Sequence, residues 1–424
     1  MERFRIVGPT RLEGTIRASG AKNAALPALA ATLLSDEPIE LANVPAVRDL
    51  RTMQRLLEHL GMAIEELDDD VLRFRRAGDY SSPDEAPYEL VKTMRASVLV
   101  LGPLVARQGH ARVSLPGGCA IGVRPIDQHL KGLEALGAEI ELDHGYVTVT
   151  AEKLRGARFR FTTLTVGGTE NLLMAAVLAE GTTVLENCAR EPEIIDLARL
   201  LQAMGAEIVG AGESTITIHG VRQLGTARHD IIPDRIEAGT YLIGAALTSG
   251  DVRVEGARTA DLAPLMEKLA EAGATVEGDA GGIRVRGNGG LHPTTVETEP
   301  HPGFPTDLQA QYMALLTRTE GVSRVRELVF ENRFQHVPEL NRMGADIRVE
   351  GNTASVHGPT PLTGAHVMAT DLRASASLVL AGVAAEGETE VHRIYHLDRG
   401  YSRMESKLQA LGAQVERFDV PMGQ

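Results

Sequence analysis

Hydrophobic positions along this chain follow one pattern six times. In each copy an amphipathic helix leads into a glycine and then a short strand. In the third copy Leu197, Leu200, Leu201 and Met204 fall at i, i+3, i+4 and i+7 and form one apolar helical face. A glycine in that position suits the end of a helix. The glycines are spaced 68 to 76 residues apart: Gly61, Gly137, Gly205, Gly273, Gly344 and Gly412. This regular spacing predicts a protein built from repeated units.

A second helix is expected upstream in each copy, and it is apolar nearly all round, which is typical of a buried helix. The expected ranges are 23–34, 93–106, 169–179, 234–247, 306–316 and 371–385. Each unit therefore contains a buried helix, a strand, an amphipathic helix and further strand. The expected fold class is α/β (α+β).

Six units in 424 residues predict two globular domains of three units each. The seam is expected near Ile232 and Pro233, between the third and fourth copies. A continuous solenoid is the alternative. The lack of recognisably polar capping units at the two ends argues against it.

Composition narrows the functional class. The chain has 43 Lys and Arg against 57 Asp and Glu, so its net charge of −14 argues against a nucleic-acid binder or a polybasic membrane-surface protein. Two cysteines, Cys119 and Cys188, cannot form a disulfide framework. No apolar stretch reaches the ~20 residues that cross a bilayer, and the first ten residues lack the apolar core of a signal peptide. We therefore expect a cytoplasmic protein.

The buried helices begin with polar residues, although their interiors are apolar. Lys22, Arg95, Arg235 and Arg373 lie at such positions. A helix N-terminus attracts anions, so cations there are unfavourable unless an anion lies between them. Surface charges that reach solvent are the alternative for each residue alone, but the recurrence favours binding of an anionic ligand.

One copy carries a glycine-rich insertion. Gly109 and Gly137 lie 28 residues apart, against 23 to 25 in the four comparable copies, and the extra residues fall within 115–125. This segment contains Cys119 and Arg124. A lone cysteine is more often a small buried residue, but one flanked by glycines near cations is suited to thiol chemistry. Cys188 lacks such an insertion and is expected to be structural.

Several familiar motifs do not occur in the sequence. It has no GxxxxGK[ST], HExxH, paired CxxC or GxSxG, and its 13 histidines are scattered. Neither a metal nor a nicotinamide cofactor is expected. Arginine and lysine clusters, a cysteine and carboxylates together indicate transfer chemistry on a multiply anionic small molecule.

Long segments resemble the UDP-N-acetylglucosamine 1-carboxyvinyltransferases, a family of enolpyruvyl transferases, along essentially the whole chain. The matching segments are 19–26 (SGAKNAAL), 115–119 (LPGGC), 124–127 (RPID), 304–307 (FPTD), 330–334 (FENRF), 371–375 (DLRAS) and 395–401 (YHLDRGY). The resemblance implies a two-domain inside-out α/β barrel with the substrates between the domains. It assigns residues 22–232 to one domain and residues 1–21 with 233–424 to the other.

The resemblance also implies the reaction. The enolpyruvyl group of phosphoenolpyruvate moves to the 3-hydroxyl of UDP-N-acetylglucosamine through a tetrahedral ketal, and phosphate is released in the first committed step of peptidoglycan synthesis. No cofactor is implied. The implied partners are the two substrates alone, with no nucleic acid, membrane or protein partner.

Residue roles follow from the matching motifs. Cys119 would protonate the methylene carbon of phosphoenolpyruvate and can form an adduct with it, and this thiol is the group that epoxides such as fosfomycin alkylate. Asp307 would accept the proton of the 3-hydroxyl, and a simple helix cap is its alternative role. Lys22 and Arg399 complete the implied catalytic set.

Two binding sets are implied as well. The phosphoenolpyruvate set comprises Lys22, Asn23, Arg124, Arg333, Arg373 and Arg399. The sugar-nucleotide set comprises Arg95, Arg124, Pro125, Ile126, Asp127, Gln128, Asp307 and Val329. His129 and Asp371 would play supporting roles. Thr163 stands where family members often carry a lysine, which puts one nucleotide contact in doubt.

Two other functions remain as alternatives. The first is 3-phosphoshikimate 1-carboxyvinyltransferase, the other enolpyruvyl transferase, against which the cysteine segment and the Lys22-Asn23 pair argue. The second is a non-catalytic nucleotide-sugar sensor. The joint presence of Cys119, Asp307, Lys22 and Arg399 argues against a sensor.

Overall fold

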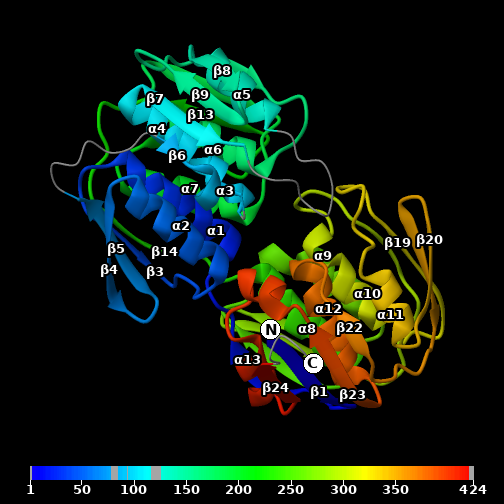
Figure 1. The fold of residues 1–424 in the computed structure, drawn as a ribbon. Helices are drawn as coiled ribbons and strands as arrows, with labels where there is room; N and C mark the ends of the chain where they lie inside the picture. Colours follow the sequence, from blue (N-terminus) through cyan, green and yellow to red (C-terminus); the bar gives the residue numbers. More distant parts are fainter. Residues whose placement is uncertain (1, 78–84, 93, 116–125, 420–424) are drawn as a thin grey trace. The chain divides into compact units, whose positions relative to one another are not determined.

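The computed structural model describes residues 2–77, 85–92, 94–115 and 126–419 (Figure 1). Contacts within the chain divide these residues into two compact units. The N-terminal unit lies within residues 20–232. The C-terminal unit combines residues 2–19 with 233–419. Each unit is described by itself below.

Each unit has three buried helical segments at its centre, as the all-apolar pattern predicts. Those of the N-terminal unit are α1 (Lys22–Ala31) with the 3-10 turn η1 (Thr32–Leu34), η2 (Arg95–Val100) with α4 (Leu101–Gln108), and α6 (Val166–Ala176). Those of the C-terminal unit are α8 (Arg235–Leu247), η3 (Thr306–Leu308) with α10 (Gln309–Leu316), and α12 (Leu372–Ala384). The helices α8, α10 and α12 pack against one another, and so do α4 with α6 and α1 with α6.

The amphipathic helices lie where the sequence predicts them. They are α2 (Arg48–His59), α5 (Asp127–Ala135), α7 (Pro192–Ala203), α9 (Thr259–Glu271), α11 (Val337–Arg342) and α13 (Met404–Ala410), with two short additions, α3 (Tyr88–Val91) and η4 (Ile394–Arg399). The glycine after each of the six has φ between 87° and 107°. Left-handed backbone of this kind favours glycine, so the recurrent glycine marks a helix C-terminus.

Within the described residues, the strands form six four-stranded sheets, three in each unit. In every sheet, the first two strands in the orders given below are parallel to each other, and the remaining neighbours are antiparallel. In the N-terminal unit the orders are β14 (Ala227–Asp230)-β3 (Ile39–Ala42)-β5 (Val71–Arg76)-β4 (Met62–Asp68), β6 (Glu85–Ala86)-β7 (His110–Ser114)-β9 (Tyr146–Thr150)-β8 (Glu139–Asp143), and β10 (Arg158–Arg160)-β11 (Thr182–Glu186)-β13 (Thr215–His219)-β12 (Glu207–Val209). In the C-terminal unit they are β2 (Glu13–Arg17)-β15 (Asp251–Glu255)-β17 (Gly282–Arg286)-β16 (Thr275–Asp279), β18 (Thr295–Glu297)-β19 (Gly321–Arg326)-β21 (Thr353–Gly358)-β20 (Asp346–Glu350), and β22 (His366–Met368)-β23 (Gly387–His392)-β1 (Glu2–Gly8)-β24 (Gln414–Asp419).

The last strand of each repeat pairs in the sheet of the next repeat. In both units the third repeat is joined in this way to the first, so the three sheets form a closed ring. In the N-terminal unit β14, from the third repeat, pairs with β3 of the first. In the C-terminal unit β1 fits between β23 and β24, and β2 pairs with β15, so the start of the chain completes two sheets. Closure of this kind gives otherwise unpaired edge strands a partner and is inconsistent with an open solenoid.

The observed helices differ from the expected ranges at their ends. The helix expected over 169–179 is α6, Val166–Ala176, because Thr165 caps it by accepting a hydrogen bond from the Gly168 N–H. The helix expected over 93–106 begins as a 3-10 turn at Arg95. Across the described ranges, no helix is both long enough and apolar enough to span a membrane.

Candidate active site

Asp307, Arg333 and Arg373 form one charged cluster in the C-terminal unit. Arg333 Nη2 donates to Asp307 Oδ1 at 2.7 Å, and Arg373 Nε and Nη2 donate to Oδ2 at 3.0 and 2.8 Å. The two arginine side chains are only 6% and 4% exposed, whereas that of Asp307 is 26% exposed. The carboxylate is therefore the more accessible part of the cluster.

The electrostatics of this cluster keep Asp307 and Arg373 ionised. Burial acts to raise the pKa of Asp307, but Arg373 and Arg333 outweigh it and hold the pKa well below its usual range. Burial acts to lower the pKa of Arg373, and Asp307 more than offsets it. Two guanidinium groups share one carboxylate, so the cluster keeps a net positive charge and is suited to bind an anion.

Arg373 is the second residue of α12, and its position is fixed at the backbone. The Asp371 side chain caps this helix by accepting hydrogen bonds from the N–H groups of Arg373 and Ala374, at 2.8 and 3.0 Å. The guanidinium carbon lies 5.5 Å from the ring centroid of Tyr401. Among the described residues, the buried Arg373 Nη1 finds no hydrogen-bond partner. One donor of a buried guanidinium group is therefore available to a ligand.

Asp307 does not act as a helix cap. It lies within the turn η3, and no side chain caps either η3 or α10. Asp234 and Asp371, in contrast, cap α8 and α12. The capping alternative for Asp307 is therefore wrong, because its carboxylate is occupied by the two arginines.

Sequence reasoning missed the residues that hold Arg333 and Val329. Thr306 Oγ1 accepts a hydrogen bond from Arg333 Nη1 at 2.8 Å and donates to Glu327 Oε2 at 2.8 Å. Glu327 is 3% exposed, and its Oε1 accepts from the N–H groups of Val329 and Phe330 at 2.9 and 3.1 Å. One buried glutamate thus connects the predicted sugar contact Val329 to the predicted anion contact Arg333.

A buried polar network beneath the cluster was missed as well. Gln311 Nε2 donates to the backbone carbonyl of Asp307 at 3.0 Å, and it also lies 3.1 Å from Thr240 Oγ1 and from the Tyr401 hydroxyl. Thr240 and Tyr401 are themselves 2.8 Å apart. The signal in the sequence was the presence of polar residues, Thr240 and Gln311 among them, inside helices that are mostly apolar.

Arg399 is the last residue of η4, which packs against α12, the helix that carries Arg373. Lys22 and Asn23 are the first two residues of α1 in the N-terminal unit, and both are half-buried. Lys22 Nζ lies 3.3 Å from Asp49 Oδ2 of α2. This ion pair offsets the unfavourable position of a cation at a helix N-terminus.

The predicted nucleotide contacts of the N-terminal unit surround the start of α5. Ile126 is the residue that precedes this helix, and Asp127 is its first residue. Asp127 Oδ2 accepts from Gln128 Nε2 at 2.8 Å, and Gln128 Oε1 accepts from the Thr162 N–H at 2.9 Å. These side chains therefore fix the start of α5 to the segment that contains Thr163.

His129 of α5 is buried, next to Asn171 of α6 and near the charge of Arg95. Its Nδ1 lies 3.0 Å from Asn171 Nδ2, and burial together with the charge of Arg95 lowers its pKa to about 4. Asn171 also accepts from the Gly102 N–H at 2.6 Å and donates to the Val98 carbonyl at 3.0 Å. The imidazole is therefore neutral at pH 7, and Asn171 connects it to Val98 in the turn that begins at Arg95.

We expect His129→Gln to reduce the pH dependence of unfolding. The folded state holds His129 with a pKa of about 4, whereas an unfolded histidine titrates near ~6.5. Between these values the unfolded chain binds a proton that the folded chain excludes, so wild-type stability rises with pH in this window, by roughly 3 kcal/mol in total, and levels off above it. Urea unfolding followed by circular dichroism measures the slope.

The matched control for this prediction is His59→Gln, because His59 is exposed at the end of α2. That variant should keep the wild-type slope. An unchanged slope in His129→Gln would contradict the neutral, buried imidazole.

Three predicted site residues, Cys119, Arg124 and Pro125, lie outside the described residues. The other cysteine, Cys188, is buried, and its Sγ lies 3.3 Å from the Leu185 carbonyl. Burial raises the pKa of this thiol to about 12. Cys188 is therefore unreactive at neutral pH, which agrees with the structural role expected for it.

Sequence comparisons match this chain, over nearly its whole length, to one family profile and to named relatives. A family profile described as EPSP synthase (3-phosphoshikimate 1-carboxyvinyltransferase) matches residues 6–408. Proteins named UDP-N-acetylglucosamine 1-carboxyvinyltransferase from Koribacter versatilis and Anaeromyxobacter sp. are 56% and 58% identical, covering 99% and 98% of this chain and 97% and 99% of their own.

Solved structures agree with the sequence comparisons. The enolpyruvyl transferase NikO from Streptomyces tendae superimposes with a TM-score of 0.89 at 27% identity and covers 99% of both chains. EPSP synthase from Acinetobacter baumannii superimposes with a TM-score of 0.74 at 19% identity, covering 99% of this chain and 100% of its own, and shows the shared fold.

Proposed function

Since the chain belongs to the enolpyruvyl transferase family, within its group of UDP-N-acetylglucosamine 1-carboxyvinyltransferases, we propose that it transfers the enolpyruvyl group of phosphoenolpyruvate to the 3-hydroxyl of UDP-N-acetylglucosamine and releases phosphate. This is the first committed step of peptidoglycan synthesis. The observation that carries the proposal is near-full-length identity above one half to enzymes of that name. The carboxylate and the two guanidinium groups of the Asp307 cluster are suited to this reaction.

The cluster offers groups for both substrates. Phosphoenolpyruvate carries a carboxylate, and the buried Arg373 Nη1 is a donor without a partner among the described residues, while Arg333 presents a second guanidinium group beside it. A planar guanidinium group pairs with a carboxylate through two hydrogen bonds. We assign the substrate carboxylate to these arginines, and the phosphate group to Lys22, Asn23, Arg124 and Arg399.

Asp307 is proposed to accept the proton of the sugar 3-hydroxyl. Its pKa is depressed by Arg373 and Arg333, so in the described arrangement it is ionised but weakly basic. When the substrate carboxylate takes over part of the hydrogen bonding of these arginines, the pKa of Asp307 rises toward its ordinary range. Binding of phosphoenolpyruvate would thereby prepare the base, which couples proton removal to the presence of both substrates.

The chemical steps balance without a cofactor. The 3-hydroxyl oxygen bonds to C2 of phosphoenolpyruvate as its proton passes to Asp307, and C3 receives a proton from the Cys119 thiol to give the tetrahedral ketal. C3 of the ketal then returns a proton to the Cys119 thiolate as the C2–O bond to phosphate breaks, which restores the double bond. The proton held by Asp307 leaves with the phosphate, so both residues regain their starting states. Cationic side chains stabilise the negative charge that the departing phosphate carries.

Nucleotide recognition is assigned to Arg95, Arg124, Pro125, Ile126, Asp127 and Gln128, with Asp307 and Val329 beside the sugar. The hydrogen bonds of Gln128 to Asp127 and Thr162 support a fixed α5 N-terminus for this purpose. Thr163 is exposed and offers a hydroxyl where relatives often carry a cation. Both substrates are small metabolites of the cytoplasm, where we propose that the protein acts, with no nucleic-acid or protein partner.

Phosphate release tests the function directly. With phosphoenolpyruvate present, we expect saturable release on adding UDP-N-acetylglucosamine and only background release on adding shikimate 3-phosphate. The opposite preference would identify the chain as a 3-phosphoshikimate 1-carboxyvinyltransferase. Binding of the sugar nucleotide without release of phosphate would identify a sensor, and it would refute the proposed activity.

A further inference from the structure

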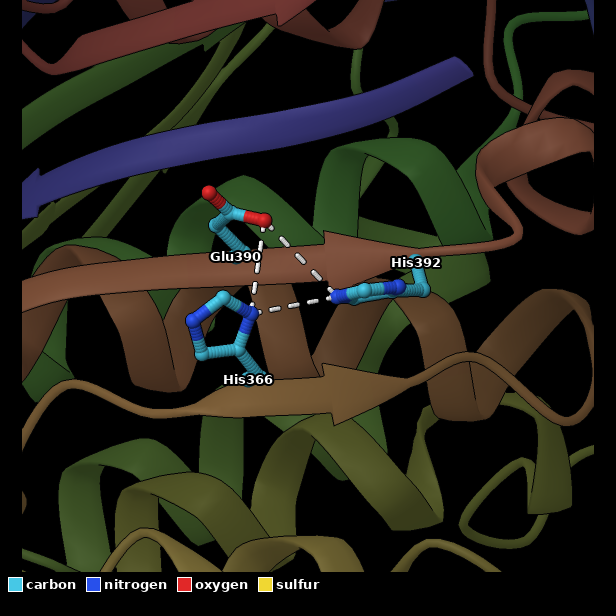
Figure 2. A group of neighbouring side chains, drawn as sticks. All are labelled: His366, Glu390 and His392. Atoms are coloured by element: carbon cyan, nitrogen blue, oxygen red, sulfur yellow. Dashed lines mark hydrogen bonds and ion pairs between the residues drawn. The ribbon is translucent and has the colours of Figure 1, made fainter. Parts of the chain in front are cut away.

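Three metal-ligating side chains meet on the outer face of a sheet in the C-terminal unit. His366 lies on β22, and Glu390 and His392 lie on the neighbouring strand β23 (Figure 2). The two strands are parallel, with His366 opposite Glu390 and Met368 opposite His392. Side chains alternate between the faces of a strand, so all three residues project from the same, outer face.

The three nearest ligand atoms form a compact triangle. His366 Nδ1 lies 3.3 Å from His392 Nε2 and 3.3 Å from Glu390 Oε2, and His392 Nε2 lies 3.8 Å from that same oxygen. Ligands at ~2.0–2.2 Å around a tetrahedral zinc ion are separated from one another by roughly 3.4 Å. The triangle therefore already has the dimensions of three corners of a zinc site.

Hydrogen bonding alone does not account for this arrangement. His366 Nδ1 is close to both other atoms, but it carries at most one hydrogen, which cannot point at both. The remaining separation, 3.8 Å from His392 Nε2 to Glu390 Oε2, is too long for a hydrogen bond. A divalent cation at the centre would satisfy the lone pairs of all three atoms at once.

We propose that His366 Nδ1, His392 Nε2 and Glu390 Oε2 bind one divalent transition-metal ion of the zinc class, with water in the remaining position. Two imidazoles and one carboxylate are a set that such ions accept. The His366 side chain is 73% exposed, so an ion and its water can reach the site from solvent. The strands hold the ligands more rigidly than a loop would.

Some neighbouring charges oppose metal binding at this site, and others favour it. Arg3 Nη1 lies 3.3 Å from Glu390 Oε2, and Arg5 Nη2 lies 3.8 Å from Oε1, so both compete with a metal for this carboxylate. Glu339 of α11 adds negative charge nearby, with its Oε2 on the Met368 N–H at 3.0 Å.

The site is distinct from the proposed catalytic cluster. None of its residues belongs to the sets assigned to either substrate, and it joins strands rather than the beginnings of buried helices. A bound ion would link β22 to β23 and so stabilise a sheet that also contains β1, from the start of the chain. Its expected effect is on stability, with turnover unchanged.

Zinc titration of the full-length protein without an affinity tag tests the proposal. Isothermal calorimetry should show one zinc ion bound per chain, and His366→Ala and His392→Ala should each weaken binding at least tenfold. His357→Ala is the matched control, because His357 is a strand histidine of the same unit outside the triangle. All three variants should release phosphate at the wild-type rate.

Two further measurements sharpen the test. Arg3→Gln should tighten zinc binding, because it removes a competitor for Glu390; unchanged or weaker binding would overturn the role of Glu390 as a ligand. Repeating the titration in a Cys119→Ser background removes a thiol that could itself bind zinc. Absence of zinc binding there, or equal affinity in His366→Ala and the parent chain, would overturn the site.

Discussion

Asp307→Asn is expected to lower kcat by about 10²–10⁴-fold, the range that a positioned acid or base contributes. Asparagine keeps the shape of the side chain and one oxygen for Arg333 or Arg373, but it cannot take a proton from the sugar hydroxyl. Binding of UDP-N-acetylglucosamine alone, measured by calorimetry, should change far less than turnover. Phosphate release under saturating substrates measures kcat.

A loss of stability must be separated from this loss of activity. Removing the charge between two buried arginines costs at most roughly 3–5 kcal/mol, so the melting temperature of the variant should fall while it remains folded at assay temperature. Asp346→Asn is the matched control, because Asp346 pairs with Arg348 where both side chains are well exposed. A folded Asp307→Asn enzyme within tenfold of wild-type turnover would remove Asp307 as the base.

Cys119→Ser is expected to lower turnover by a similar factor, about 10²–10⁴-fold, because a serine hydroxyl is far too weak an acid to protonate a carbon atom. Cys119→Asp restores an acid and should be much more active than Cys119→Ser. Its carboxyl group titrates near ~3.9, against ~8.5 for a thiol. The aspartate variant should therefore lose activity as pH rises through a range in which the wild type remains active.

Intact-mass measurement adds a readout that does not depend on rate. Wild-type protein with phosphoenolpyruvate should show a covalent adduct, and neither Cys119 variant should. Cys188→Ala serves as the control, because Cys188 is buried with a thiol pKa of about 12 and should contribute neither turnover nor labelling. Cys119→Ser with more than a tenth of wild-type turnover, or with the adduct retained, would show that Cys119 is a bystander.

The sequence by itself determined the repeated architecture. The six helix-ending glycines, from Gly61 to Gly412, all have the positive φ that their position predicted, and the all-apolar segments form the buried centres of the units. These features depend on local backbone preference and on the period of apolar residues, both of which can be read within a dozen positions. The family resemblance then named Asp307, Arg333 and Arg373 as site residues.

Only the tertiary structure decided how these residues act on one another. Asp307 and Arg373 are 66 positions apart, and their hydrogen bonds arise because separate repeats bring the beginnings of their buried helices together. The same holds for Gln311 with Tyr401, and for His366 with Glu390 and His392, which looked scattered along the chain. A local pattern specifies which face a residue occupies, but its neighbour on that face is set by strand pairing and by closure of the repeats, which involve distant segments.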